Sequence, residues 1–147
     1  MYQRLLVPVD GSDLTDRAID ASIDLARQLG ASITAYVAEP VMTPPSGPRS
    51  RAWFDEEAKE HDAMTESHAR QVLTRFEQRA RDAGVPFDGC FDRVPRVDRA
   101  IVAAAESRGC DMIVMVTHGR GAFGEFLFGS QTKAVLAGSK LPLLVLH

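Results

Sequence analysis

Five consecutive apolar residues, Met112 to Val116, constrain the fold more than any other stretch of this sequence. A strand that is apolar at every position is typical of the centre of a parallel sheet, where helices cover both faces. A second apolar run, Leu5 to Val9, ends at Asp10, Gly11 and Ser12, as expected for a buried strand followed by a turn. Together these runs predict an α/β fold built on a parallel sheet.

The rest of the chain alternates between strand-like and helix-like segments. In the first helical segment, Leu14, Ala18, Leu25 and Leu29 recur on one helix face before Gly30 ends it. The pattern predicts strands at 5–9, 32–38, 87–94, 112–116 and 141–146, and helices at 13–29, 55–83, 97–108 and 130–137, with Ser12 capping the first helix. Right-handed crossovers turn this order into a doubly wound, five-stranded parallel sheet with helices on both faces.

Other segments are predicted to lie at the surface. Residues 40–50 hold four of the eight prolines and predict a loop, and residues 117–129 form a glycine-rich connection. Charged residues within 87–94 predict a strand near a sheet edge. The apolar strand at 141–146 ends the chain, where an edge position would expose it. Either a second copy of the chain or the preceding helix is expected to cover it.

Composition excludes several classes of protein. With 147 residues, 45% of them hydrophobic and 25% charged, the chain predicts one globular domain over 1–147. A net charge of −3 does not provide the basic surface that nucleic-acid binding requires. No apolar run approaches the roughly 20 residues that span a bilayer, and polar residues follow Val7 too soon for a signal peptide. We expect a cytoplasmic protein that binds neither nucleic acid nor a membrane.

The cysteines and histidines form no metal-binding or redox motif. Cys90 and Cys110 lie in different segments and have no second thiol or histidine at zinc-finger spacing. Both are expected to be small buried side chains and not disulfide partners. Because the four histidines include no H-E-x-x-H pattern, the sequence predicts no metal site made by the protein alone.

The expected binding site lies at the carboxyl ends of the strands. Open parallel sheets bind ligands where the winding direction changes, which here is between the strands at 5–9 and 112–116. Polar or glycine-rich segments follow several strands, at 10–12, 37–39, 117–121 and 129–132. These segments are the candidates for a site.

Three phosphate-binding patterns do not fit. Residues 119–124 match G-x-G-x-x-G, but a dinucleotide fold carries that motif after its first strand and needs an acidic residue about 20 positions later. Residues 124–129 have P-loop spacing, but Ser130 stands where the phosphate-binding lysine belongs. A response regulator would need an aspartate at the end of the third strand, which ends at Val94, and no lysine follows Lys140.

A different arrangement, Gly119-x9-Gly129-Ser130, remains. Backbone amides, the positive end of a helix dipole and the Ser130 hydroxyl are expected to converge there on a phosphate group. Across the crevice, Asp10 is expected to bind ribose hydroxyls or a divalent cation, or alternatively to cap the first helix or share in the turn at Ser12. The backbone of Val37 is placed to meet an adenine edge, whereas Ser130 could instead be only a helix cap.

These segments together resemble the universal stress protein family. The resemblance rests on residues 7–12, on 111–115 followed by 117–121, on Gly129-Ser130, and on 142–145, and it extends over essentially the whole chain. It implies an adenine nucleotide alpha hydrolase-like fold with strand order 3-2-1-4-5 and a homodimer joined through the C-terminal strand. In one branch of the family it also implies ATP held by G-x2-G-x9-G-[ST].

The resemblance implies a set of nucleotide contacts. They are Pro8, Val9, Asp10, Val37, Met115, Val116, His118, Gly119, Gly129, Ser130, Gln131 and Thr132. The expected ligand is ATP, with AMP or ADP as alternatives and Mg as an accompanying ion. No general base for hydrolysis is evident, so we expect a stress-response regulator with slow ATP hydrolysis at most.

The chain departs from the family pattern at three positions. Val116 replaces the first glycine of the ATP motif, and Pro95 and Val97 replace the glycine and proline usual before the third helix. A β-branched residue is stiff and disfavours positive φ, so Val116 must stay extended. The alternative function is therefore a nucleotide-free dimeric scaffold that acts through protein contacts.

Overall fold

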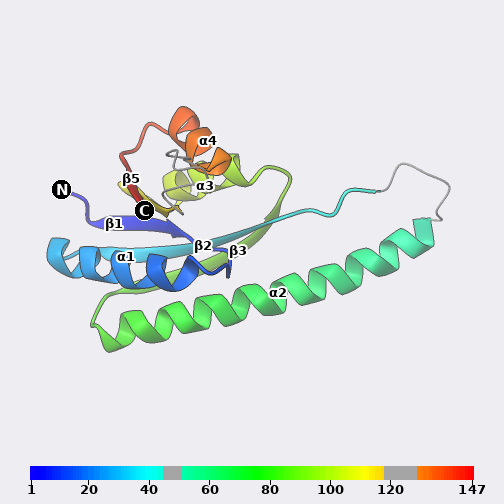
Figure 1. The fold of residues 1–147 in the computed structure, drawn as a ribbon, viewed down its shortest axis with the longest axis horizontal. Helices are drawn as coiled ribbons and strands as arrows, with labels where there is room; N and C mark the ends of the chain where they lie inside the picture. Colours follow the sequence, from blue (N-terminus) through cyan, green and yellow to red (C-terminus); the bar gives the residue numbers. More distant parts are fainter. Residues whose placement is uncertain (45–50, 118–128) are drawn as a thin grey trace, which may run out of the picture.

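The structure, a computed structural model, describes residues 1–44, 51–117 and 129–147. Strands and helices alternate along the chain (Figure 1). They are β1 (Arg4–Pro8), α1 (Thr15–Leu29), β2 (Ser32–Pro40), α2 (Arg51–Asp82), β3 (Phe87–Val94), α3 (Val97–Ser107), β4 (Met112–Val116), α4 (Ser130–Gly138) and β5 (Leu143–Leu146).

The five strands form one parallel sheet in the order β3-β2-β1-β4-β5, which confirms the predicted fold. Strand β1 lies at the centre, where Leu5 pairs with Ile33 of β2 on one side and Met112 of β4 on the other. Strands β3 and β5 form the two edges of the sheet. Both edge positions agree with the sequence, which has charged residues within β3 and places β5 last in the chain.

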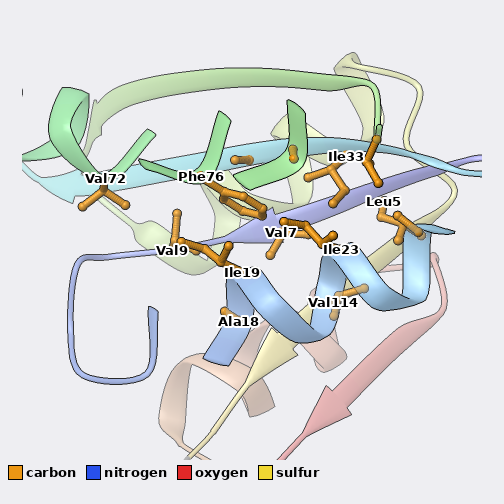
Figure 2. Close-up of a cluster of buried hydrophobic side chains, with 14 of the residues drawn as sticks. Leu5, Val7, Val9, Ala18, Ile19, Ile23, Ile33, Val72, Phe76 and Val114 are labelled. Carbon is orange, nitrogen blue, oxygen red and sulfur yellow. The ribbon is translucent and has the colours of Figure 1, made fainter. Parts of the chain in front are cut away.

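One face of the sheet packs against α1 and α2. Figure 2 shows Val7 of β1 among Ile19 and Ile23 of α1 and Phe76 of α2, all of them buried. Phe76 also meets the ring of Phe87 at 5.1 Å between centroids. These contacts arise because alternate residues of β1 face this side of the sheet.

The opposite face packs against α3 and α4. Leu6 and Ile113 of the central strands form a second buried cluster with Ile101 of α3 and Val135 of α4. Cys110 is buried as expected, whereas Cys90 is only half-buried. The prediction that both cysteines are buried side chains is therefore wrong for Cys90. The reason is its place on edge strand β3, which among the described residues has a neighbouring strand on one side only.

The start of α1 differs from the sequence prediction. The backbone N–H of Ser12 donates to the Asp10 carboxylate at 3.0 Å, and that of Thr15 donates to the Ser12 carbonyl at 3.1 Å. These bonds form a turn, and α1 begins at Thr15 with Leu14 at the N-cap and no side-chain cap. The prediction that Ser12 caps the helix is therefore wrong.

Several other boundaries also shift. Strand β2 continues to Pro40, which pairs with Val94, so the loop does not begin at residue 40 as predicted. Helix α2 begins at Arg51, earlier than the predicted residue 55, and its N-terminal end extends beyond the sheet (Figure 1). Strand β5 begins only at Leu143. Among the helices in the described ranges, none is long and apolar enough to cross a membrane.

Candidate functional site

A cavity of about 550 Å³ opens at the carboxyl ends of β1 and β4. Strand β1 leads into α1 on one face of the sheet, whereas α4, which comes after β4, packs on the opposite face. Connections that diverge in this way leave a crevice between two neighbouring parallel strands. The position of the cavity agrees with the site expected from the strand order.

Most of the predicted contact residues in the described part of the chain line this cavity. They are Pro8, Val9, Asp10, Met115, Val116, Gly129, Gln131 and Thr132. They come from the β1 and β4 ends and from the start of α4. Segments separated by more than 100 residues are thus brought around one space.

One part of the cavity wall is apolar, and sequence reasoning missed it. Its residues are Leu14 and Ala18 from the α1 side, Tyr36 and Ala38 from β2, and Val97 and Ile101 from α3. The apolar periodicity of α3 marked Ile101 as facing inward, but it did not distinguish the core from a cavity. Such a wall suits a flat, apolar ring system.

Tyr36 has a polar contact at its far end. Its hydroxyl donates a hydrogen bond to the Asp92 carboxylate on β3 at 3.1 Å. Burial raises the pKa of Tyr36 well above its usual range, and the bond to Asp92 adds to this shift. The phenol therefore stays protonated, so Tyr36 is a neutral part of the cavity wall and cannot act as a base there.

The loop after β1 contributes the polar part of the cavity. Asp10 and Ser12 both line the space, and the Asp10 carboxylate is oriented by the Ser12 N–H. Asp10 therefore stabilises the turn, as one of the two interpretations of the sequence held. This turn does not preclude ligand binding, because a carboxylate has acceptor sites for several hydrogen bonds.

Thr15, the first residue of α1, also lines the cavity. It is 2% exposed, and its hydroxyl has no hydrogen-bond partner among the described residues. Buried polar groups are nearly always paired in folded proteins, and leaving one unpaired costs about 1–3 kcal/mol. Its hydroxyl is therefore a position where a ligand or a water molecule would be stabilised.

The start of α4 forms the other polar border of the cavity. Gly129 occupies the N-cap without a side-chain cap bond, so Ser130 is not the N-cap residue. Ser130 is exposed and does not line the cavity, whereas Gln131 and Thr132 do. The predicted residues His118 and Gly119 lie outside the described residues.

Val116 borders the cavity without closing it. Its side chain packs with the cluster on the α1 face, and its backbone continues β4 in register with Leu146 of β5. The strand geometry thus accommodates the branched side chain. The cavity remains open beside it.

The side chain of Val37 does not line the cavity. It is fully buried in the cluster on the α1 face and pairs with Phe91 of β3. Its neighbours Tyr36 and Ala38 line the cavity instead. Among the described residues, no three acidic, histidine or cysteine side chains lie close enough to hold a metal ion.

Comparisons with known proteins agree with this architecture. Residues 1–147 match the Universal stress protein family. A universal stress protein of Thermus aquaticus is 31% identical over 148 residues, covering 100% of both chains.

Two solved universal stress proteins share the fold. One, in complex with cAMP, has a TM-score of 0.69 and 24% identity, covering 99% of this chain and 97% of its own. Another, from Archaeoglobus fulgidus in complex with dAMP, has a TM-score of 0.61 and 21% identity, covering 99% and 98%. The match over the full sequence and the parallel sheet in the order 3-2-1-4-5 lead to the same conclusion. This chain belongs to the universal stress protein family.

Proposed function

We propose that the protein binds an adenine nucleotide at the carboxyl ends of β1 and β4 and acts as a homodimeric, cytoplasmic stress-response regulator. The single observation that carries this proposal is the cavity there, with Asp10 and the start of α4 on its border. ATP is the first ligand to test, with AMP and ADP as alternatives. Mg would arrive with the phosphates of ATP.

The apolar wall supports an adenine ring as the bound base. Tyr36, Ile101 and Met115 provide apolar surface, and the volume of about 550 Å³ lies in the range of small-molecule sites. The ligands named for the two solved relatives, cAMP and dAMP, both contain adenine. Like ATP, both carry adenine on a pentose with a phosphate group, and adenine is the part that the apolar wall would contact.

The polar border supports the sugar and phosphate groups. Asp10 accepts hydrogen bonds and fits ribose hydroxyls, and the nearby Thr15 hydroxyl has no partner in the described part of the chain. The first backbone N–H groups of α4 have no partners within the helix, so they suit a phosphate at the Gly129 end. The hydrogen-bond donors and acceptors on this border therefore fit a nucleotide.

The open cavity beside Val116 favours nucleotide binding over the nucleotide-free scaffold. Val116 would prevent binding if its side chain filled the crevice, but it packs into the cluster on the α1 face. The scaffold remains the second candidate, because a valine at this position prevents the closer backbone approach that glycine allows.

The edge strand β5 supports the homodimer. Its residues are apolar, only partly buried, and paired on one side with β4. An unpaired apolar edge favours the addition of another strand. A second copy of the chain, which carries the same edge, would cover it symmetrically.

Thermal unfolding with ligand tests nucleotide binding. ATP, Mg-ATP and AMP at millimolar concentration should each be compared with GTP. A ligand that binds only the native state at 100 times its Kd stabilises it by about 2.7 kcal/mol, so Tm should rise with the adenine nucleotides.

Two aspartate variants sharpen this test. Asp10→Ala should reduce the rise in Tm, whereas Asp24→Ala, an exposed aspartate of α1 outside the cavity, should preserve it. If no adenine nucleotide raises the Tm of the unaltered protein, the scaffold function is supported instead.

A further inference from the structure

His68 links α2 to the loop that borders the cavity. Its ring nitrogen Nε2 lies 3.3 Å from the carbonyl oxygen of Asp10. Because a carbonyl oxygen can only accept, Nε2 must carry the hydrogen and donate this bond. The contact joins positions 58 residues apart in the sequence.

Gly11 allows this close contact. It has φ of +79°, and a Cβ built there would lie 2.0 Å from His68 Nε2 and 3.1 Å from Val72 Cγ2. Any side chain at this position would therefore strain the backbone and displace His68. The turn after β1 and the face of α2 that carries His68 are complementary in shape.

The position of His68 is stabilised by its own helix. The next residue, Ala69, is fully buried, and Val72 one turn later belongs to the core drawn in Figure 2. On the N-terminal side, Arg93 of β3 forms ion pairs with Asp62 at 3.1 Å and Glu66 at 3.8 Å. Contacts on both sides of His68 thus fix this part of α2 against the sheet.

We infer that His68 is a positioning residue for the nucleotide site, an inference that rests on the proposed function. It does not line the cavity, so it acts through Asp10, whose carbonyl it binds and which itself lines the cavity. The His68 bond and the Ser12 bond to the carboxylate restrain Asp10 at two different atoms. A restrained Asp10 loses less conformational freedom when a ligand binds, which favours affinity.

Three variants test this role by calorimetric titration with AMP. His68→Ala removes the donor and should weaken binding about 2- to 10-fold, the range expected for loss of one hydrogen bond. His68→Gln retains an N–H donor of similar reach and should recover most of the affinity. His61→Ala is the matched control, because His61 is also an exposed histidine of α2 and does not line the cavity.

Amide hydrogen exchange provides a second measurement that needs no ligand. In His68→Ala the hydrogen-bonded Ser12 and Thr15 amides of this turn should exchange faster than in the unaltered protein, whereas His61→Ala should leave them unchanged. Equal AMP affinity in His68→Ala and the unaltered protein would overturn the inference, and so would equal exchange. If the unaltered protein binds no nucleotide, the proposed function fails, and exchange alone decides whether His68 restrains the turn.

Discussion

Tyr36 illustrates, at the scale of one residue, how a side chain can serve the core and the cavity together. It is 2% exposed and packs in the cluster beneath α3, yet it also forms part of the cavity wall. Its hydroxyl is buried but paired with Asp92, so the cost of removing a polar group from water is offset. The residue thereby contributes a rigid surface for a ligand.

Cys90 provides a prediction at this scale. Burial raises the pKa of its thiol from 9.0 to about 11, against a smaller opposing effect of Arg108. Only the thiolate reacts with iodoacetamide, and a pKa raised by about two units lowers the thiolate fraction about 100-fold. In a Cys110→Ala background, Cys90 of the native protein at pH 8 should therefore be alkylated about 100-fold more slowly than Cys90 of the protein unfolded in urea. Equal rates in the native and unfolded proteins would contradict the raised pKa.

The same shift predicts how stability depends on pH. The native state holds the thiol proton more tightly than the unfolded state does. The stabilisation is therefore fully present below pH 9 and is lost as pH rises toward about 11. Urea unfolding at pH 8 and pH 10.5 should show a smaller decrease in stability for Cys90→Ala than for the unaltered protein.

At the scale of single elements, α2 and β5 differ in how they are supported. The buried residues of α2, from Ala69 to Ala80, lie in its second half, whereas its N-terminal end extends beyond the sheet (Figure 1). Strand β5 is short but hydrogen-bonded to β4 along its length. The exposed edge of β5, in contrast, is where we propose that a second copy binds.

The backbone of β5 provides a selective test of the dimer. The carbonyls of Pro142 and Leu146 accept bonds from β4 and from the residue after it, so the main-chain groups of Val145 face the outer edge. Val145→Pro removes an outward N–H that β4 does not use, and should convert the dimer to a folded monomer. Val145→Ala retains the N–H and should remain dimeric.

Sedimentation equilibrium measures this outcome, and circular dichroism checks that both variants are folded. A monomeric unaltered protein would contradict the proposed dimer. A dimer that persists in a folded Val145→Pro variant would show that the two copies associate through another surface.

At the scale of the whole molecule, one sheet separates two hydrophobic clusters. Ile19 belongs to the cluster on the α1 face and Ile113 to the cluster on the α3 face, and both are fully buried. Both clusters include residues of the central strand β1, so neither is expected to unfold alone.

Matched truncations on the two faces test this cooperativity. Ile19→Val and Ile113→Val should each lower the free energy of unfolding by about 1 kcal/mol, and the double variant by the sum. Leu136→Ala, which truncates a side chain that is 64% exposed, should change it by less than about 0.5 kcal/mol. Two separate urea transitions in any of these proteins would contradict a shared core.

Sequence patterns predicted elements better than their boundaries. The alternation of strands and helices along the chain was correct, because hydrophobic periodicity reflects which faces are buried. The strand order 3-2-1-4-5, which the family resemblance implied, was correct too. The start of α1 was wrong because Asp10 forms a turn with Ser12, and a helix-capping signal looks the same in sequence as a turn signal. The start of α2 was wrong because Trp53 and its neighbours carry no clear N-terminal signal.

The sequence by itself determined the alternation of strands and helices, the interior place of the strand from Met112 to Val116, and the edge of the sheet where a site could lie. These features depend on local composition and on the geometry common to parallel sheets. Only the tertiary structure decided that Tyr36 and Ile101 wall the cavity, that Val116 leaves it open, and that His68 reaches Asp10. Such contacts join residues distant in sequence, and they depend on packing distances that no local pattern encodes.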